Sequence, residues 1–164
     1  MTRWHHHTVI VLALLLLQVV VAPAALAAYG QPGLEVDASC IVTRVIDGDT
    51  FSCILSEVYS TGLEGLRPGM EARVRLADIN APELRPEPEP GAVKATSMLS
   101  SLLQNETVYL DIDDMYVFDR YGRIVAVALV PYNGTHLVNV NLLLVSRGLA
   151  EVWEHDNEWV ISET

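Results

Sequence analysis

The hydrophobic pattern of the chain begins with one long apolar run and then changes to short alternating segments. Residues 8–21 are almost entirely apolar, and the small-residue sequence Ala25-Leu26-Ala27 follows them. This layout predicts a secretory signal peptide over 1–27, with cleavage after Ala27. An uncleaved membrane anchor over 9–28 is the alternative, because that stretch is just long enough to span a bilayer. Either way, we expect the rest of the chain to lie outside the cytoplasm, secreted or held at the membrane.

Beyond a lead-in at 28–38, alternation of apolar and polar residues predicts five short strands. Asp47-Gly48 is a tight-turn signal, so the first two strands should form a hairpin. Clustered glycines predict a loop over 56–70, and clustered prolines predict another over 82–90. The expected strands are 40–46, 50–55, 72–79, 107–112 and 123–130.

Two segments change to the helical period. The first covers 92–104, and the second covers 138–147, after a turn at Asn133-Gly134 and before Gly148 as a helix stop. In the first helix one apolar face is expected, made of Val93, Met98, Leu99, Leu102 and Leu103.

The order of elements predicts one α+β domain, mainly β, over 39–159, with a short tail at 160–164. A helix follows the third strand and another follows the fifth. That order is compatible with a five-stranded barrel of the oligonucleotide/oligosaccharide-binding (OB) type. The pattern alone does not distinguish this barrel from an open sheet.

Composition narrows the class of protein. The 164 residues carry 21 acidic and 10 basic side chains, a formal charge of −11. This charge argues against a broad basic groove that holds nucleic acid by charge alone. Two cysteines exclude a disulfide-dense scaffold and a four-cysteine zinc site.

The cysteines lie on opposite arms of the first expected hairpin. In an exported protein Cys40 and Cys53 are a natural disulfide pair. A two-residue turn, however, places Cys53 opposite Val42 and Cys40 opposite Leu55, which makes the cysteines diagonal neighbours. A bulge in either arm would bring them closer together. The alternative is a pair of buried thiols.

Three polar clusters stand out at the ends of expected strands. They are Asp47-Gly48-Asp49-Thr50, Arg75-Leu76-Ala77-Asp78-Ile79-Asn80-Ala81-Pro82-Glu83 and Phe118-Asp119-Arg120-Tyr121-Gly122-Arg123. Each alone is typical of a turn or of a surface ion pair. Together with Val140-Asn141 and Gly148-Leu149-Ala150, these three clusters resemble the staphylococcal nuclease (thermonuclease-like) family in their order and residue sequence. The resemblance covers about Cys40 to Val152.

This resemblance implies an OB-fold barrel and a phosphodiesterase that acts on DNA or RNA with Ca²⁺; because Asn80 replaces an aspartate of the family, Mg²⁺ or Mn²⁺ are alternatives. It implies metal ligands at Asp49, Asn80 and the backbone carbonyl of Ala81. It implies Glu83 as the general base. The remaining implied roles are Arg75 and Arg123 on the scissile phosphate and Tyr121 at the nucleotide pocket.

The residue types suit the chemistry. Guanidinium groups hold two phosphate oxygens in a fixed geometry and stay charged. A hard cation with oxygen ligands stabilises developing negative charge, and a carboxylate beside the attacking water can accept its proton.

Asn80 departs from the family pattern, which has an aspartate there. Its amide oxygen can bind a cation, but one ligand charge is lost. We therefore expect a weaker metal site, or one helped by Asp47 or Asp78. Asp78 is otherwise expected to be a solvated carboxylate at a strand end, and Asp111, Asp113 and Asp114 are expected at an exposed strand end.

The leading hypothesis is an exported, monomeric, metal-dependent nuclease with no protein partner. The alternative is a catalytically weak or inactive OB-fold module at the cell surface that binds nucleic acid or a protein. Asn80 and the acidic composition favour that alternative, whereas Arg75, Glu83 and Arg123 argue against it. A structural surface domain held by 9–28 is a third reading.

Overall fold

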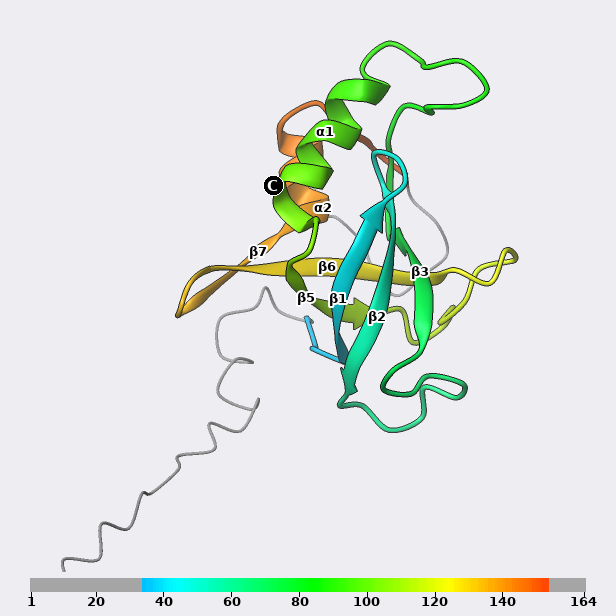
Figure 1. Cartoon of the computed structure of the whole chain (residues 1–164), viewed down its shortest axis with the longest axis vertical. Coiled ribbons are helices and arrows are strands. Elements are labelled where there is room, and N and C mark those ends of the chain that lie inside the picture. Colours follow the sequence, from blue (N-terminus) through cyan, green and yellow to red (C-terminus); the bar gives the residue numbers. More distant parts are fainter. Residues whose placement is uncertain (1–33, 154–164) are drawn as a thin grey trace, which may run out of the picture.

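A computed structural model describes residues 34–153, which form a barrel with two helices at one end (Figure 1). The strands and helices follow one another along the chain, with the longer connections after β2, before α1 and before β6. In chain order they are β1 (Ala38–Val45), β2 (Thr50–Val58), β3 (Glu71–Leu76), β4 (Ile79–Asn80), α1 (Ala92–Leu103), β5 (Thr107–Ile112), β6 (Ile124–Asn133), β7 (His136–Asn139), α2 (Val140–Ser146) and β8 (Glu151–Val152).

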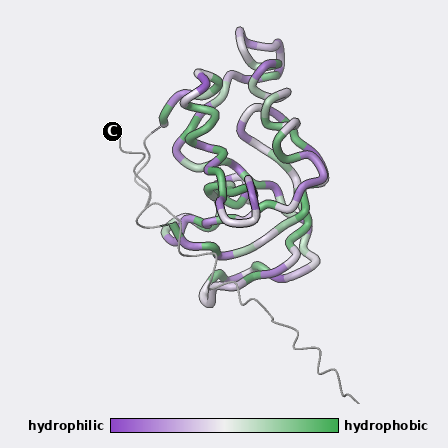
Figure 2. The backbone as a smooth tube through the Cα atoms, turned by 90° about the vertical axis from the view of Figure 1, so that its left-hand side faces the viewer, coloured by the Kyte–Doolittle hydropathy of each residue, from purple (hydrophilic) through white to green (hydrophobic). Residues whose placement is uncertain are grey.

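The main sheet closes on itself. Its strand order is β3-β2-β1-β5-β6-β7, and β3 also pairs with β6 in parallel. Five strands therefore form a closed barrel, and β7 extends it beyond β6. This confirms the expected mainly β, OB-type barrel with a helix after the third and after the fifth long strand. Apolar side chains fill the interior, including Phe51, Leu76 and Leu110. Hydrophilic segments lie largely at loops and turns, such as the proline-rich loop at the top of Figure 2.

The β1–β2 hairpin has the register expected from the sequence between Cys40 and Val42, with an irregularity on either side of this stretch. Cys40 pairs with Leu55, and Val42 pairs with Cys53. The turn is longer than two residues, and a β-bulge between Val42 and Arg44 restores the register. A bulge therefore changes how the hairpin closes without moving its core positions to the other face.

Cys40 and Cys53 are free thiols in the barrel interior. They lie close together, since a hydrogen bond with Cys53 is the main cause of a raised pKa at Cys40, with burial second. Their disulfide stays a prediction, which counting free thiols by mass with and without reductant would test.

The expected third strand, 72–79, breaks at Asp78. β3 ends at Leu76, and Asp78 has a φ of 57°, a left-handed conformation that Asp adopts more readily than most residues. The chain then enters β4, which pairs with β8: Ile79 with Val152 and Asn80 with Glu151. Asp78 is also buried, so its expected solvated position is wrong.

Two helices cover one end of the barrel (Figure 1). α1 buries Ala95, Leu99 and Leu103, but Val93, expected on the same face, is 61% exposed. α2 is shorter than expected: Asn139 is its N-cap, and its side chain accepts a hydrogen bond from the Leu142 N–H at 3.1 Å. Val138 and Asn139 belong to β7, although they were expected in the helix.

Two acidic residues near the end of β5 are buried rather than exposed. Asp111 accepts a hydrogen bond from the Glu35 N–H at 3.1 Å. Asp113 accepts from the N–H groups of Met115 and Tyr116, each at 2.8 Å, and so shapes the following loop. The expectation of an exposed end therefore holds only for Asp114. In the stretch before β1, Asp37 is buried and accepts from the Ile112 N–H at 2.7 Å.

Within 34–153 no helix has the length and apolar character needed to cross a bilayer. The predicted signal peptide, its alternative as an anchor, and the tail at 160–164 lie outside the described residues.

Candidate active site

The loop between β1 and β2 places Asp49 at the end of the barrel that faces α1. The Asp49 N–H donates to Asp47 Oδ1 at 3.1 Å, and the Asp49 carbonyl accepts from the Leu76 N–H at 2.9 Å. Asp49 is 7% exposed, and its Oδ1 accepts from the Thr50 hydroxyl at 3.0 Å. The carboxylate is thus fixed by its own loop and by β3.

Gly48 allows this loop to approach its neighbours closely. A Cβ at position 48 would lie 2.6 Å from the Cβ of Ala81 and 2.8 Å from the Cβ of Ala95. Both distances are shorter than side-chain carbons tolerate, and Ala95 belongs to the rigid helix α1. Glycine at 48 therefore brings the loop, the segment after β4 and α1 together around Asp49.

Arg75 connects the residues expected to bind metal. Its Nη2 lies 3.3 Å from Asp49 Oδ2 and donates to Asn80 Oδ1 at 3.1 Å. Its Nη1 donates to the Leu76 carbonyl at 2.7 Å. One guanidinium group thus bridges a carboxylate from the β1–β2 loop and an amide from β4, and it is held by three oxygens.

Burial and charge act in opposite directions in this pair. Burial raises the pKa of Asp49, and the Arg75 charge and the Ala81 N–H offset only part of that rise. Burial also lowers the pKa of Arg75, with Asp49 opposing the change. Both charged forms are therefore held at a desolvation cost and depend on each other.

Asn80 and Ala81 are positioned by the C-terminal strand. Pairing of Asn80 with Glu151 fixes β4, and the Ala81 N–H then donates to Asp49 Oδ2 at 2.8 Å. Asp49, Asn80 and Ala81 therefore come together, as the resemblance implied.

Glu83 lies in the exposed loop that leads to α1. Its N–H donates to Glu89 Oε2 at 2.9 Å, and its carbonyl accepts from the Glu89 N–H at 2.9 Å, so the loop closes on itself. The Glu83 charge raises the pKa of Arg75, although the two side chains make no direct contact. Glu83 is thus near the arginine with its carboxylate in solvent.

Arg123 reaches the same region from the loop before β6. Its Nε donates to Asp119 Oδ2 at 2.7 Å, and its N–H donates to Asp119 Oδ1 at 2.9 Å. The positive charge of Arg123 lowers the pKa of Arg75, which places the two guanidinium groups within electrostatic reach. β3 and β6 pair in parallel, with Val74 beside Ile124, and so bring the two arginines together.

Tyr121 lies at the tip of this loop and is 62% exposed. The Cζ atoms of Arg120 and Arg123 lie over its ring, 4.8 Å and 5.3 Å from the ring centroid. These are cation–π distances. The exposed aromatic face is thus held beside Arg123.

The donor set near Asp49 fits a hard cation. It consists of a carboxylate, the amide oxygen of Asn80 and the carbonyl of Ala81, which are the oxygen types that Ca²⁺ and Mg²⁺ prefer. Its negative charge is low, since no cluster of three His, Cys, Asp or Glu side chains occurs within 34–153. Asp47 is an additional carboxylate beside Asp49, and its charge raises the pKa of Asp49.

Two residues that position the site were missed. Asp119 orients Arg123, and the Asp-x-x-Gly turn of the third cluster is the signal that could have indicated it. Buried Asn141 accepts from the Ala128 N–H at 3.1 Å and donates to the Ala77 carbonyl at 2.8 Å, which ties α2 to the turn before β4. A hydrophilic residue within an apolar helix is the signal there.

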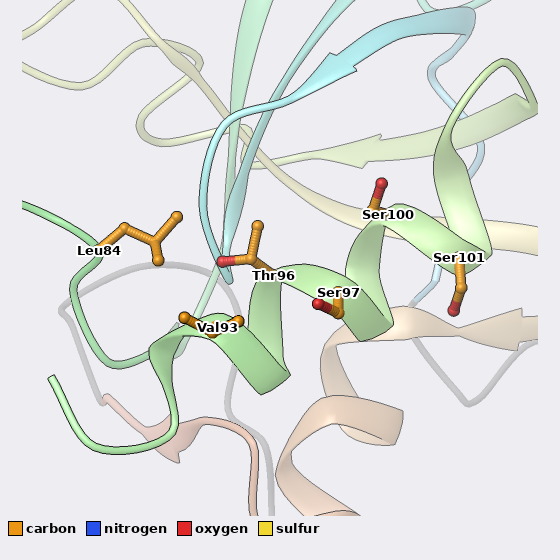
Figure 3. A pocket seen from close by; sticks show the side chains of 6 residues that line it. All are labelled: Leu84, Val93, Thr96, Ser97, Ser100 and Ser101. Atoms are coloured by element: carbon orange, nitrogen blue, oxygen red, sulfur yellow. The ribbon is translucent and has the colours of Figure 1, made fainter. Parts of the chain in front are cut away.

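A hollow of about 540 Å³ lies on the outside of α1 (Figure 3). Leu84 and Val93 face it from one side, and hydroxyl side chains of α1 line the rest. None of its lining residues is ionisable, so it offers no acid, base or charged ligand.

A closed OB-type barrel with two arginines and a carboxylate at one end defines a nuclease-type hydrolase fold. The chain belongs to the staphylococcal nuclease homologue family, whose family model matches residues 73–162. The matched segment includes Arg75, Asn80, Ala81, Glu83, Tyr121 and Arg123, whereas Asp49 precedes it. A search of curated proteins finds no match.

Proposed function

We propose that this domain hydrolyses phosphodiester bonds of DNA or RNA, with the scissile phosphate bound between Arg75 and Arg123. The observation that carries the proposal is the proximity of these two like charges. Each repels the other, and each has one carboxylate partner. A phosphate between them would relieve that repulsion and accept donors from both forks.

Glu83 is the general base of the proposed reaction. Its exposed carboxylate accepts a proton from water as the water oxygen attacks phosphorus in line. The bond from phosphorus to the leaving oxygen breaks, and that oxygen departs with the electron pair. Arg75 and Arg123 stabilise the charge that develops on the phosphoryl oxygens, which is usually the largest catalytic contribution.

We place the cation, Ca²⁺ by family resemblance and Mg²⁺ or Mn²⁺ as alternatives, at Asp49, Asn80 and the Ala81 carbonyl. When bound, it supplies Lewis-acid stabilisation to a phosphoryl oxygen. Arg75 already donates to Asp49 and Asn80, so these two side chains position the arginine as well as any cation.

Export of a monomer, secreted or membrane-anchored, is part of the proposal. It rests on the signal-peptide pattern of 1–27 and on the alternative anchor over 9–28.

Cleavage of denatured DNA and of RNA by the purified chain tests the proposal, with Ca²⁺, Mg²⁺ or Mn²⁺ and with chelator. We expect metal-dependent cleavage that falls about 10²–10⁴-fold in Glu83→Gln and about 10²–10³-fold in Arg123→Gln. Glu87→Gln, an equal loss of charge in the same exposed loop, is the control and should cleave normally.

Intact cleavage by Glu83→Gln would overturn the mechanism. Absence of cleavage with all three metals, from protein whose circular dichroism shows the fold, would overturn the nuclease proposal. Binding of nucleic acid without cleavage would then favour the OB-fold binding module.

A further inference from the structure

A second hollow, of about 590 Å³, lies on the outer face of β1, β2 and β3. Arg44, Ser52 and Arg73 line it from the strands, and Phe118 and Gly122 line it from the loop before β6. We call it the arginine hollow. None of its lining residues is one of the site residues described above.

Strand register places the arginine hollow directly beside the candidate active site. Thr50 pairs with Arg75, and one step further along the same strands Ser52 pairs with Arg73. Arg73 and Arg75 point to the same face of β3, about 6.6 Å apart by the strand rise. A chain bound along β3 can therefore pass from one arginine to the next.

The second wall of the hollow is also shared with the site. Phe118 and Gly122 belong to the loop that carries Arg123. Val74 pairs with Ile124 in parallel, so the residues just before them, Arg73 in β3 and Arg123 at the end of the loop before β6, are near each other. Both walls of the hollow thus continue into the proposed phosphate site.

The two arginines of the hollow have no structural task that explains them. Both are exposed, and within 34–153 neither guanidinium group has an ion-pair or hydrogen-bond partner. Register places Arg44 opposite Ser52 and Ser52 opposite Arg73, so they flank one position of β2. Two unpaired cations held this close raise the local potential and favour an anion.

This concentration of positive charge contrasts with the rest of the chain. The formal charge is −11, with 10 basic residues. Apart from Arg3, all of them lie in the described part. Five belong to the hollow or to the loop and strand beside it: Arg44, Arg73, Arg75, Arg120 and Arg123.

We propose that the arginine hollow binds the single strand that flanks the scissile phosphate, with Arg44 and Arg73 on adjacent phosphates and Phe118 against a base. The inference rests on the proposed function, whose substrate it extends. Guanidinium groups suit phosphate, and base–aromatic stacking tolerates any sequence. Glu71, the carboxylate in the lining, repels the strand and marks the far end of its path.

The test measures binding of a fluorescent 12-nucleotide single strand to the full chain in chelator, by anisotropy over a salt series. We expect Arg44→Gln with Arg73→Gln to weaken binding by about tenfold per arginine. The slope of log K against log salt should fall by about 0.7 for each lost phosphate contact. The charge-matched control is Lys94→Gln with Arg147→Gln, two exposed bases on or beside the helices.

Two further variants separate charge from stacking. Glu71→Gln should tighten binding, because it removes the carboxylate. Phe118→Leu should weaken binding without changing the salt slope. For a dinucleotide, the effect of the double arginine variant should be smaller than for the 12-nucleotide strand.

An unchanged salt slope in the double arginine variant, or a change equal to that of the control, would overturn the proposal that the arginine hollow binds a single strand. Because binding is measured without cleavage, failure of the nuclease proposal is separate: a chain that never cleaves but shows the expected slopes retains the hollow. If the chain cleaves but the two double variants bind equally well, the proposal of strand binding at the arginine hollow is wrong and the nuclease proposal stands.

Discussion

The two sides of the candidate active site are held in different ways. Around Asp49, contacts join residues that are far apart in the chain: Asp49 with Arg75 and with Ala81, and Gly48 with Ala95. Around Arg123, the main contacts are local, since Asp119 bonds the N–H of Tyr121 and both the N–H and side chain of Arg123. The contacts around Asp49 should therefore be lost only when the whole barrel unfolds. The loop around Arg123 should instead open locally while the barrel stays folded.

The comparison predicts its largest effect at Arg75. Arg75→Met leaves Asp49 buried without the positive charge of Arg75, which should lower the free energy of unfolding by about 3 kcal/mol. Urea unfolding measures this. The double variant Arg75→Met with Asp49→Asn should recover part of the loss, because no uncompensated charge is left. A single variant as stable as the parent would contradict the interdependence of the pair.

Gly48→Ala should have the next effect. The added Cβ meets Ala81 and Ala95 at less than 3 Å, so the loop must move, at a cost of about 2 kcal/mol. Oligonucleotide cleavage should fall with it, because the loop carries Asp49. Gly134→Ala is the control, since a Cβ there has no neighbour within 4 Å. Equal unfolding midpoints for the two variants would argue against close packing at 48.

Asn80→Asp examines the charge of the Asp49 side. A second carboxylate among the proposed ligands should tighten Ca²⁺ binding by about tenfold, because hard-cation affinity follows ligand charge. Isothermal calorimetry of the parent and the variant measures it. Unchanged affinity would place the cation elsewhere.

The smallest effect is expected at Asp119. Burial raises the pKa of Asp119, but hydrogen bonds from Arg123 and Tyr121 outweigh burial and hold it below the ordinary value. The stabilisation is therefore present above about pH 4 and is lost as the pH falls through the lowered pKa. Amide shifts of Tyr121 and Arg123 should follow this titration by NMR.

Asp119→Asn should remove that titration and lower the free energy of local opening of the loop by about 1 kcal/mol. The unfolding midpoint of the barrel should change little. A global loss of stability would show that the loop is not independent.

The sequence predicted the parts of the fold that follow local rules. The register around Cys40 was predicted from a two-residue turn and holds because a bulge offsets the longer turn, and Gly148 follows the second helix with a φ of 61°. The break at Asp78 was missed because a left-handed residue that is not glycine has no reliable local signal. β7 was missed because Val138 continues the apolar pattern of α2.

The site residues were predicted by resemblance, and their connections were not. Nothing in the spacing of Arg75 and Asn80 says that one guanidinium would bridge Asn80 and Asp49. Burial of Asp111 and Asp113 was missed because each depends on backbone N–H groups of other segments, which a sequence pattern does not contain.

The pairing of β4 with β8 sets the order in which the site can be completed during synthesis. Asn80 obtains its strand partner only when Glu151 has left the ribosome, and the Trp153 N–H then bonds the Asp78 carbonyl at 2.8 Å. A nascent chain that lacks this last turn and strand has Arg75 and Glu83 but no fixed position for Asn80. If the chain is threaded through a translocation pore N-terminus first, the finished site can form only on the far side.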